Sequence, residues 1–511
     1  MPIVGSIIKG ALELRSRMPD KKRVIKRPFI EQNKILKKLL RKAQYTSFGE
    51  YYRFEEILAS SNKINEFKKR VPVFDYTKMH YNWWYRTLSG EQYVSWPGRV
   101  KYFALSSGTS GSSSKYIPLT TDMLKAIKKT SVRQLVSLVK YDLPREFFEK
   151  GILMLGGSTH LNFNGTYYEG DLSGITTGNL PFWFQHYYKP GKRISKERDW
   201  SAKLEEIVNK ATEWDIGAIV GVPAWMQILL EKIIDRYKLK HIHEIWPNLT
   251  IFCHGGVSFT PYIKTFEKLL GKPLIYIETY LASEGFFAYQ NRPNTNSMKL
   301  VFDNGIFYEF IPYNKTNFDT EGNLIENPET LTVNEIKENE DYALLVSTVA
   351  GAWRFLIGDV IRFTSKEELE LQIVGRTKHY LSVCGEHLSV ENMDRAIEML
   401  ENKFNIGVKE YTVAGIPYGT MFAHKWWIGT DDNIDVKLAA QKIDEYLKVL
   451  NDDYRVERIA AIKNVEAIIV KPINFYNYLK MNGKEGGQFK FPRVLKGQNI
   501  NEWESYVEKI L

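Results

Sequence analysis

The most constraining feature of this chain is a run of hydroxyls, glycines and one lysine that follows an apolar segment. Residues Ser106–Lys115 read SSGTSGSSSK and come directly after the apolar run VKYFAL at 100–105. Gly108 and Gly111 allow the backbone to turn its N–H groups toward an anion, and Lys115 adds a positive charge beside the hydroxyl donors. We therefore interpret the run as a phosphate-binding loop, since a flexible linker rarely joins a strong strand to a strong helix.

A helix is expected soon after this loop. Thr120 and Thr121 follow Pro118 and can cap its N-terminus. Apolar residues recur beyond them at helical spacing: Met123, Ile127, Leu135 and Val139. The positive end of this helix is expected to lie near the loop and to favour an anion there.

Other phosphate and nucleophile templates do not match the sequence. The Walker A pattern needs Gly-Lys five residues after its first glycine, where this chain has Ser113-Ser114. The chain contains no Gly-x-Gly, no Gly-x-Ser-x-Gly and no His-Glu-x-x-His. Ser112 and Lys115 match the Ser-x-x-Lys of penicillin-binding enzymes, but neither Lys-Thr-Gly nor Ser-Asp-Asn accompanies them. Dinucleotide, protein-kinase, serine-esterase and zincin motifs are therefore not supported.

Composition bounds the class of protein. A chain of 511 residues with 44% hydrophobic residues is long enough for at least two packed domains. Two cysteines imply no disulfide framework and fit a reducing compartment, so we expect a cytoplasmic protein. Residues 1–20 lack the apolar core of a signal peptide. The longest apolar stretch, 216–230, is too short to span a bilayer, and we expect no membrane insertion.

The net charge of +10 makes a nucleic-acid partner an alternative to be weighed. Much of the positive charge lies at residues 21–41, where Ile35, Leu39 and Leu40 form an apolar stripe and lysines cover the opposite face. The segment lacks the interleaved aromatic residues of a single-strand stacking platform. We interpret it as a solvated helix surface and expect no nucleic acid, keeping a nucleic-acid-binding module as the minor alternative.

Strand-like and helical segments alternate through the middle of the chain, which predicts an α/β layered sheet. The strand candidates are 151–155, 216–222, 249–253 and 273–278, and the helix candidates include 200–214 and 225–237. Residues 300–349 are β-rich with Asn-Gly and Glu-Gly turns. Beyond 375–378, strand candidates at 411–416, 424–429 and 465–470 surround an amphipathic helix.

The expected fold class is therefore α/β. We predict a large multi-layered α/β N-terminal domain with a β-rich subdomain at 1–380, a hinge at 381–391, and a small mobile α+β C-terminal domain at 392–511.

Two further segments carry chemistry that suits a nucleotide. Residues 278–285 (ETYLASEG) place hydroxyls and carboxylates on a turn, a composition that suits Mg²⁺ shared with phosphate oxygens. Residues 353–359 (WRFLIGD) end in Asp359, whose carboxylate can accept from ribose hydroxyls. Taken in order, Ser-Ser-Gly-Thr-Ser-Gly, Tyr-x-Ala-Ser-Glu and Arg-x-x-x-Gly-Asp resemble the three nucleotide motifs of the Gretchen Hagen 3 acyl acid amido synthetases, members of the adenylate-forming superfamily.

The resemblance covers nearly the whole chain, from residues 44–49 (QYTSFG) through 71–76 (VPVFDY) to 488–493 (QFKFPR). It implies the adenylate-forming architecture, the cofactors ATP and Mg²⁺, and a two-step reaction, and we expect a non-plant member. A carboxylate attacks the α-phosphate of ATP to give acyl-AMP and pyrophosphate. An amine, usually of an amino acid, then displaces AMP to form an amide.

The resemblance also implies roles for individual residues. The loop would hold the β- and γ-phosphates through Ser106, Ser107, Gly108, Thr109, Ser110 and Lys115. Ser283 would touch the α-phosphate, Glu284 would hold Mg²⁺, and Asp359 would hold the ribose. Further nucleotide contacts are implied at Gly255, Gly256, Thr279, Tyr280 and Arg376. Lys490, from the small domain, would neutralise the α-phosphate, so Lys490 and Glu284 are catalytic candidates.

One position departs from the family pattern. Members usually carry a lysine in the hinge segment, where this chain has Gly385-Glu386-His387. Histidine is only partly charged near neutrality, so phosphate neutralisation by His387, the third catalytic candidate, becomes pH-dependent. Cys384-x-x-His387 also resembles half a zinc site, but Cys253 is the only other cysteine, and we expect no metal role there.

This departure makes a prediction. Replacing His387 with lysine is expected to leave activity intact and to flatten the acid side of the pH profile, because lysine stays charged where histidine titrates. Pyrophosphate release measured against pH tests this, and an unchanged profile contradicts a role for His387.

The substrates are predicted only by class. Trp183 and Trp225 are expected to line an apolar or aromatic acid pocket, although aromatic residues are equally common in cores. The expected partners are a small carboxylic acid and an amine, and the expected state is a monomer or weak dimer. Three alternatives remain: an acyl-CoA synthetase that uses a thiol, a kinase that releases ADP, and a nucleotide-binding protein without turnover.

Overall fold

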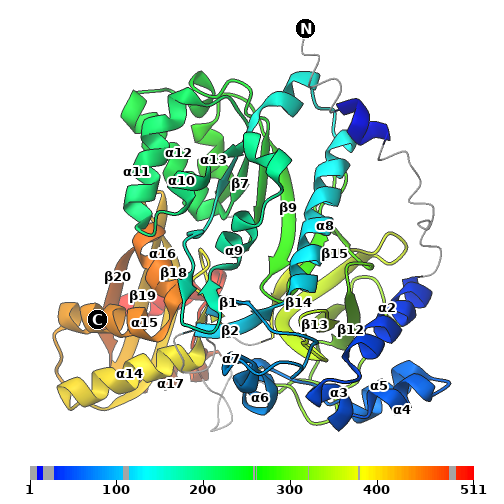
Figure 1. Ribbon diagram of the computed structural model, residues 1–511. Helices are drawn as coiled ribbons and strands as arrows, with labels where there is room; N and C mark the ends of the chain where they lie inside the picture. Colours follow the sequence, from blue (N-terminus) through cyan, green and yellow to red (C-terminus); the bar gives the residue numbers. More distant parts are fainter. Residues whose placement is uncertain are drawn as a thin grey trace. The chain divides into compact units, whose positions relative to one another are not determined.

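The computed structural model describes residues 9–14, 28–107, 114–256, 259, 262–319, 322–377, 380–482 and 491–511. The chain forms two compact units: Met1–Leu105 with Tyr116–Thr377, and Ser106–Lys115 with Lys378–Leu511. Figure 1 shows helices layered against large sheets, which confirms the predicted α/β class. The division into a domain at 1–380, a hinge at 381–391 and a small domain at 392–511 stays a prediction.

The first unit is built on an 11-stranded sheet in the order β12-β13-β14-β15-β11-β10-β9-β8-β7-β3-β6. The parallel strands are β3 (Gly151–Leu155), β6 (Tyr188–Lys189), β7 (Ile216–Gly221), β8 (Ile251–Gly255) and β9 (Ile275–Ala282). The antiparallel strands are β10 (Gly285–Tyr289), β11 (Met298–Leu300), β12 (Ile306–Pro312), β13 (Asp341–Thr348), β14 (Phe355–Ser365) and β15 (Glu370–Arg376). Because β9 pairs with both β8 and β10, the predicted α/β region and the predicted β-rich region are continuous in one sheet.

Helices cover both faces of the parallel strands, which explains why β3 and β7 carry no polar side chain. On one face lie α11 (Trp200–Lys210), α12 (Pro223–Tyr237) and α13 (Ile263–Leu269), and α8 (Thr121–Ser137) lies on the other (Figure 1). Successive residues of β8 divide between the two layers: Phe252 stacks on Phe266 of α13 with ring centroids 5.0 Å apart, whereas Ile251 packs with Tyr141 and Phe148.

N-terminal helices pack on the antiparallel strands through one large hydrophobic cluster. They are α2 (Pro28–Ala43), α3 (Ser47–Tyr51), α4 (Phe54–Ala59) and α5 (Lys63–Arg70). Residues 44–49 have a packing role here: Thr46 caps α3 by accepting from the Gly49 N–H at 3.1 Å, and a side chain at Gly49 would collide with the Ala43 carbonyl. Phe48 is fully buried and stacks on Trp353.

A second sheet of the chain has the order β2-β1-β5-β4. Its strands are β1 (Tyr102–Ser107), β2 (Ser114–Leu119), β4 (Asn162–Phe163) and β5 (Tyr168–Gly170). Shorter helices complete this part of the chain: α6 (Tyr76–Met79), α7 (Tyr85–Leu88), α9 (Leu172–Gly178) and α10 (Lys192–Ser195).

The second unit contains the predicted small α+β domain. β18 (Val408–Tyr418), β19 (Met421–Thr430) and β20 (Ile462–Val470) form its sheet, which includes all three predicted strands. The β19 to β20 connection is parallel and runs through α15 (Val436–Leu450) and α16 (Asp452–Ala460). The other elements are β16 (Tyr380–Leu381), β17 (Leu388–Ser389), α14 (Val390–Phe404), α17 (Pro472–Met481) and α18 (Gln498–Glu508).

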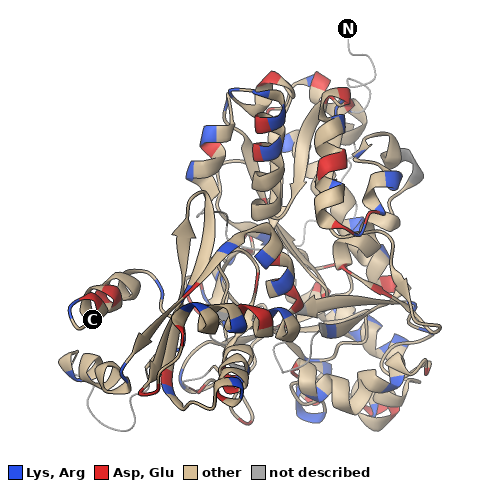
Figure 2. Cartoon of the chain, turned by 90° about the vertical axis from the view of Figure 1, so that its left-hand side faces the viewer, with Lys and Arg blue, Asp and Glu red and all other residues tan. Residues whose placement is uncertain are grey.

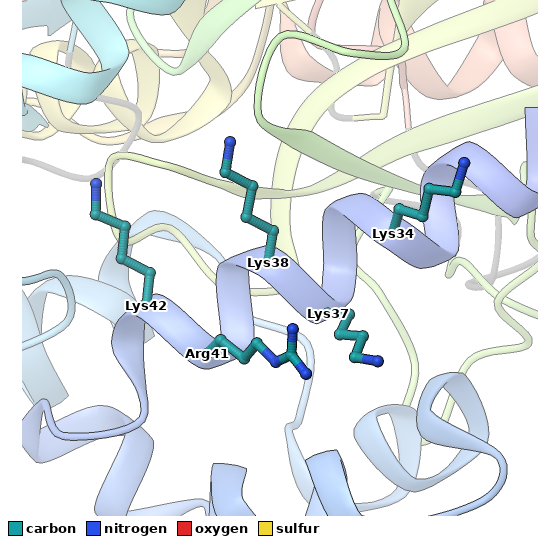
Figure 3. A pocket seen from close by; sticks show the side chains of 5 residues that line it. All are labelled: Lys34, Lys37, Lys38, Arg41 and Lys42. Atoms are coloured by element: carbon teal, nitrogen blue, oxygen red, sulfur yellow. The ribbon is translucent and has the colours of Figure 1, made fainter. Parts of the chain in front are cut away.

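The surface agrees with the interpretation of the basic segment as solvated helix where the structure describes it. α2 buries Ile35, Leu39 and Leu40 and presents its basic side chains outward. Figure 3 shows the surface pocket that they line: Lys34, Lys37, Lys38, Arg41 and Lys42. Figure 2 shows basic and acidic positions interspersed along many helices. Among the described residues, the helices are too short or too polar to cross a bilayer.

Candidate functional site

The candidate site lies around β9, where the large sheet changes from parallel to antiparallel pairing. Gly255 ends the neighbouring parallel strand β8, and Thr279 and Tyr280 lie near the end of β9. The carboxyl ends of parallel strands are where open α/β sheets bind their ligands, particularly where the strand order changes. Predicted nucleotide residues that are far apart in the sequence therefore meet at one edge.

The two glycines after β8 allow a close approach of backbones. Gly255 is the register partner of Thr279 on β9, and a side chain at Gly255 would collide with the Thr279 carbonyl oxygen. Gly256 has a φ of +85°, which favours glycine. Together they leave the backbone without side chains at two of the predicted nucleotide contacts.

Replacing Gly255 with alanine is expected to lower the free energy of unfolding by about 1–3 kcal/mol, because the new methyl group must push β8 away from β9. Gly375→Ala is the matched control, since Gly375 also lies in a strand of this sheet but has no atom within 4 Å of an added Cβ. Thermal denaturation of both variants measures the difference. Equal stability of the two would contradict the tight approach at Gly255.

Asp359 is the best organised of the predicted site residues. The Tyr280 hydroxyl donates to its Oδ2 at 2.6 Å, and Arg376 Nε lies 3.1 Å from its Oδ1. Asp359 and Arg376 are register partners on β14 and β15. Burial, and after it the Asp359 carboxylate, raises the pKa of Tyr280 well above its usual value, so the hydroxyl stays protonated and donates. Three predicted residues thus meet: Tyr280 and Asp359 are buried and hydrogen-bonded, and the exposed Arg376 forms an ion pair with Asp359.

Curvature of the sheet makes this group possible. Three strands separate β9 from β14, and in a flat sheet that separation would be roughly 19 Å, beyond the reach of a tyrosine. The 2.6 Å hydrogen bond between Tyr280 and Asp359 therefore requires a strongly curved sheet. β11 lies between β9 and β14, and with only three residues it fills little of the space between them.

The predicted phosphate and metal ligands of the second motif lie on a tight turn. Ser283 and Glu284 are the two residues between β9 and β10, whose ends pair through Ala282 and Gly285. Both side chains are half-buried. A carboxylate and a hydroxyl on one hairpin turn fit the few protein ligands that Mg²⁺ takes beside phosphate oxygens.

Thr279 is placed differently from its neighbour. Successive side chains of a strand point to opposite faces, so Thr279 points away from the face that carries Tyr280. Gln134 Nε2 of α8 donates to Thr279 Oγ1 at 2.9 Å and to Cys253 Sγ at 3.2 Å. The Thr279 hydroxyl therefore holds α8 against β8 and β9, and a nucleotide contact at this residue would use its backbone.

Two further titratable groups lie near this edge, the buried His254 and the half-buried Glu278, and the sequence motifs assigned neither a role of its own. His254 and Glu278 are register partners on β8 and β9, and Glu278 shares the face of Tyr280. Burial lowers the pKa of His254 to about 4 and raises the pKa of Glu278. His254 Nδ1 has no hydrogen-bond partner among the residues that the structure describes. The alternation along 278–280 is the signal that would have added Glu278 to the site.

The described flanks of the phosphate loop are Ser106 and Ser107 at the end of β1 and Lys115 in β2. Gly108, Thr109 and Ser110 lie outside the described residues. The expectation that the next helix begins near the loop is wrong, because β2 intervenes and its six residues span about 20 Å. Thr120 does cap α8, accepting from the Met123 N–H at 3.1 Å, but the field of a helix end fades within a turn.

The segment at 71–76 supports both sides of the site. Phe74 forms a β-bridge to Phe355 at the start of β14. The Tyr76 hydroxyl accepts from the Tyr116 N–H at 2.9 Å, directly after Lys115. Residues 71–76 thus position the start of β14 and Tyr116 of β2.

Arg354, the first residue of the third motif, has a structural role. Its guanidinium forms an ion pair with Glu309, in which both side chains are buried, with N–O distances of 3.0 Å. Its other donors reach the carbonyls of Lys68 and Val71 and the hydroxyl of Thr330 at 2.7–3.0 Å. All five N–H donors of the arginine are used, so none remains for a nucleotide. Arg354 fixes the start of the strand that carries Asp359.

The remaining catalytic candidates belong to the second unit. His387 has a φ of +42°, and its Nδ1 lies 3.0 Å from Asp453 Oδ2 on α16. Lys490 lies outside the described residues. Cys384 is buried, which raises the pKa of its thiol, and the described part of the chain contains no cluster of three or more metal-ligating side chains.

The two predicted acyl-pocket residues are not brought together by any described contact. Trp225 lies in the first turn of α12 and packs on Trp200 of α11 with ring centroids 4.6 Å apart. The backbone of Trp183 forms part of a short 3-10 helix (Phe182–His186), and its side chain lies outside what the structure describes. The acyl pocket stays a prediction.

Sequence profiles identify the family. The GH3 family N-terminal domain matches residues 20–160 and 158–275, the GH3 family central domain matches 299–376, and the GH3 family C-terminal domain matches 391–499. A probable indole-3-acetic acid-amido synthetase, GH3.9 of Oryza sativa subsp. japonica, is 24% identical over 287 residues, or 51% of this chain and 63% of that protein. Indole-3-acetic acid-amido synthetase GH3.5 of Arabidopsis thaliana is 26% identical over 295 residues, covering 51% and 47%. The chain thus spans about half the length of these curated relatives.

Solved structures share the fold over almost the whole chain. GH3.15 acyl acid amido synthetase superposes with a TM-score of 0.58 at 16% identity, covering 94% of this chain and 93% of that one. A 2-hydroxyisobutyryl-CoA ligase in complex with 2-HIB-AMP and CoA superposes with a TM-score of 0.61 at 12% identity, covering 96% and 93%. These likenesses confirm the predicted fold. Because the family profiles match most of its length, this chain belongs to the GH3 family.

Proposed function

We propose that this protein uses ATP to activate a carboxylic acid as acyl-AMP, with release of pyrophosphate, and then transfers the acyl group to an amine to form an amide. The amine is proposed to be that of an amino acid. The observation that carries the proposal is the contact of the buried Tyr280 and Asp359 side chains, with the exposed Arg376 beside them, which joins the second and third nucleotide motifs.

The hydrogen bonds of Asp359 leave room for a ribose. Each carboxylate oxygen has two lone pairs. Tyr280 engages Oδ2 and Arg376 engages Oδ1, so each oxygen retains capacity for one more donor. Two adjacent ribose hydroxyls require such a pair of acceptors, and the two fixed donors hold the carboxylate in one orientation for them.

The chemistry at the α-phosphate requires positioning and charge stabilisation more than covalent participation by the protein. On the proposed function, Ser283 contacts the α-phosphate and Glu284 holds Mg²⁺, which when bound neutralises charge on the phosphates. Ser106, Ser107 and Lys115 flank the loop proposed to hold the β- and γ-phosphates. Lys490 and His387 keep their proposed part in neutralising the α-phosphate.

The choice of acceptor separates the two nearest functions. The fold alone does not distinguish them, because the amido synthetase and the CoA ligase superpose about equally well. Membership of the GH3 family favours an amine over a thiol, since its curated relatives are amido synthetases. The cytoplasmic location and the monomer or weak dimer remain proposals.

The experiment is a two-stage screen of the purified protein. A panel of carboxylic acids is supplied with ATP and Mg²⁺, and pyrophosphate and AMP are measured. The best acid is then supplied with amino acids or with CoA, and the amide or thioester is identified by mass. Carboxylate-dependent pyrophosphate followed by an amide supports the proposal. Release of ADP would indicate a kinase, a thioester would indicate a CoA ligase, and no carboxylate-dependent pyrophosphate from any acid would overturn the proposal.

A further inference from the structure

A buried carboxylate organises the loop at 383–387 in the second unit. Glu386 has no exposed surface, and its carboxylate accepts from the backbone N–H groups of Val383, Cys384 and Gly385 at 2.8–3.1 Å. The loop therefore wraps its own backbone donors around one of its side chains. Nothing in the proposed reaction uses this carboxylate directly.

His424 of β19 completes the group. Its Nε2 lies 3.0 Å from Glu386 Oε1, and neither side chain is exposed. Burial alone would raise the pKa of Glu386, but the hydrogen bonds from His424 and from the backbone outweigh it and lower that pKa to about 2. The carboxylate is therefore ionised at every working pH, and it ties the loop to the central strand of the sheet.

The residues that follow extend the same anchorage. The His387 carbonyl accepts from Asn451 Nδ2 at 3.2 Å, and His387 Nδ1 contacts Asp453. Asn451 Nδ2 also donates to Asn392 Oδ1 at 3.1 Å, and Asn392 forms a capping box with Ser389 at the start of α14. Residues 383–392 are thus bonded to β19, α14 and the α15–α16 junction, all within the second unit.

We infer that Glu386 is a positioning residue that locks the loop at 383–387 onto the second unit and thereby fixes where His387 is presented. The inference deepens the proposed function, and its expected effect on kcat rests on that function. The anchoring of the loop does not depend on the proposed function. Much of the predicted hinge, 383–391, is therefore a rigid part of the second unit.

The substitution Glu386→Ala tests the lock, because it leaves three backbone donors and His424 without their acceptor. Hydrogen exchange of the intact protein is followed by mass spectrometry for the peptide containing 383–387. We expect exchange there to accelerate about tenfold or more, since hydrogen bonds to charged groups are the stronger ones, while β18, β19 and α15 stay protected. Glu386→Gln keeps the size of the side chain and one acceptor oxygen, so an intermediate acceleration of hydrogen exchange is expected. This variant decides the outcome if the alanine variant does not fold.

A second readout separates positioning from general destabilisation. On the proposed function, Glu386→Ala and Glu386→Gln each lower kcat for amide formation about tenfold. The KM for ATP changes less than about twofold, because Asp359 and the β9–β10 turn belong to the first unit. Asp435→Ala is the matched control: Asp435 is a carboxylate of the same unit that caps α15 by accepting from the Leu438 N–H at 3.0 Å. It is expected to lose stability without altering exchange at 383–387 or kcat.

Unchanged exchange at 383–387 in Glu386→Ala, or rapid exchange already in the natural protein, would overturn the lock. Accelerated exchange with an unaltered kcat would overturn the positioning of His387. A natural protein without any turnover would refute the proposed function instead, and the exchange result would still decide the anchoring.

Discussion

Arg354→Met is expected to lower the free energy of unfolding by about 3–5 kcal/mol, the usual cost of removing one partner of a buried ion pair. Glu309 is 1% exposed and would keep a carboxylate without its cation. The carbonyls of Lys68 and Val71 would also lose their donor. Arg354 has a φ of +40°, an unfavourable conformation that its five hydrogen bonds maintain.

Arg362→Met is the matched control for this substitution. Arg362 lies on the same strand, β14, and pairs with Asp341 at 2.6 Å, but its side chain is 43% exposed. Exposed pairs contribute about 0–1 kcal/mol, so thermal denaturation should separate the two variants clearly. Adding Glu309→Leu to Arg354→Met should recover part of the loss, because the isolated charge is then removed. Similar melting temperatures for the two single variants would contradict the structural role of Arg354.

Asp359→Asn is expected to lower kcat/KM for ATP about 10²–10⁴-fold on the proposed function, because two hydrogen bonds to a charged acceptor are each worth about 1.5–3 kcal/mol. The asparagine carbonyl can still accept from Tyr280, so the fold should be retained. Carboxylate-dependent pyrophosphate exchange at varied ATP concentration measures the effect. A kcat/KM for ATP equal to that of the natural protein would exclude Asp359 from the nucleotide site.

Asp341→Asn is the control for this experiment. Asp341 and Arg362 form an aspartate–arginine pair across neighbouring strands of the same sheet, as Asp359 and Arg376 do, but without a buried tyrosine donor. Its substitution removes the same charge and should leave pyrophosphate exchange unchanged. Activity loss in both variants would attribute the effect to sheet stability.

Short-range patterns in the sequence predicted elements well where local physics decides them. The strand at 151–155, the helix after Thr120 and the strands of the second unit follow from apolar periodicity and capping. The strand β2 between the loop and the helix was not predicted, because the alternation of the apolar residues Ile117 and Leu119 was not recognised as a strand pattern. The order of the motifs also grouped Arg354 with the nucleotide-binding residues. A motif shows which residues occur together, but it does not show what each of them contacts.

The sequence by itself determined the chemistry of this protein: a hydroxyl-rich loop, a Ser-Glu turn and a Gly-Asp end, in an order that places the chain in the GH3 family. Only the tertiary structure decided which of these residues act together. Tyr280 meets Asp359 because a long sheet curves, Thr279 turns away because strand side chains alternate, and Glu386 meets His424 through a loop closing on a distant strand. Such contacts join residues that are tens of positions apart in the sequence. The local conformational preferences of a chain do not determine how close such residues come in space.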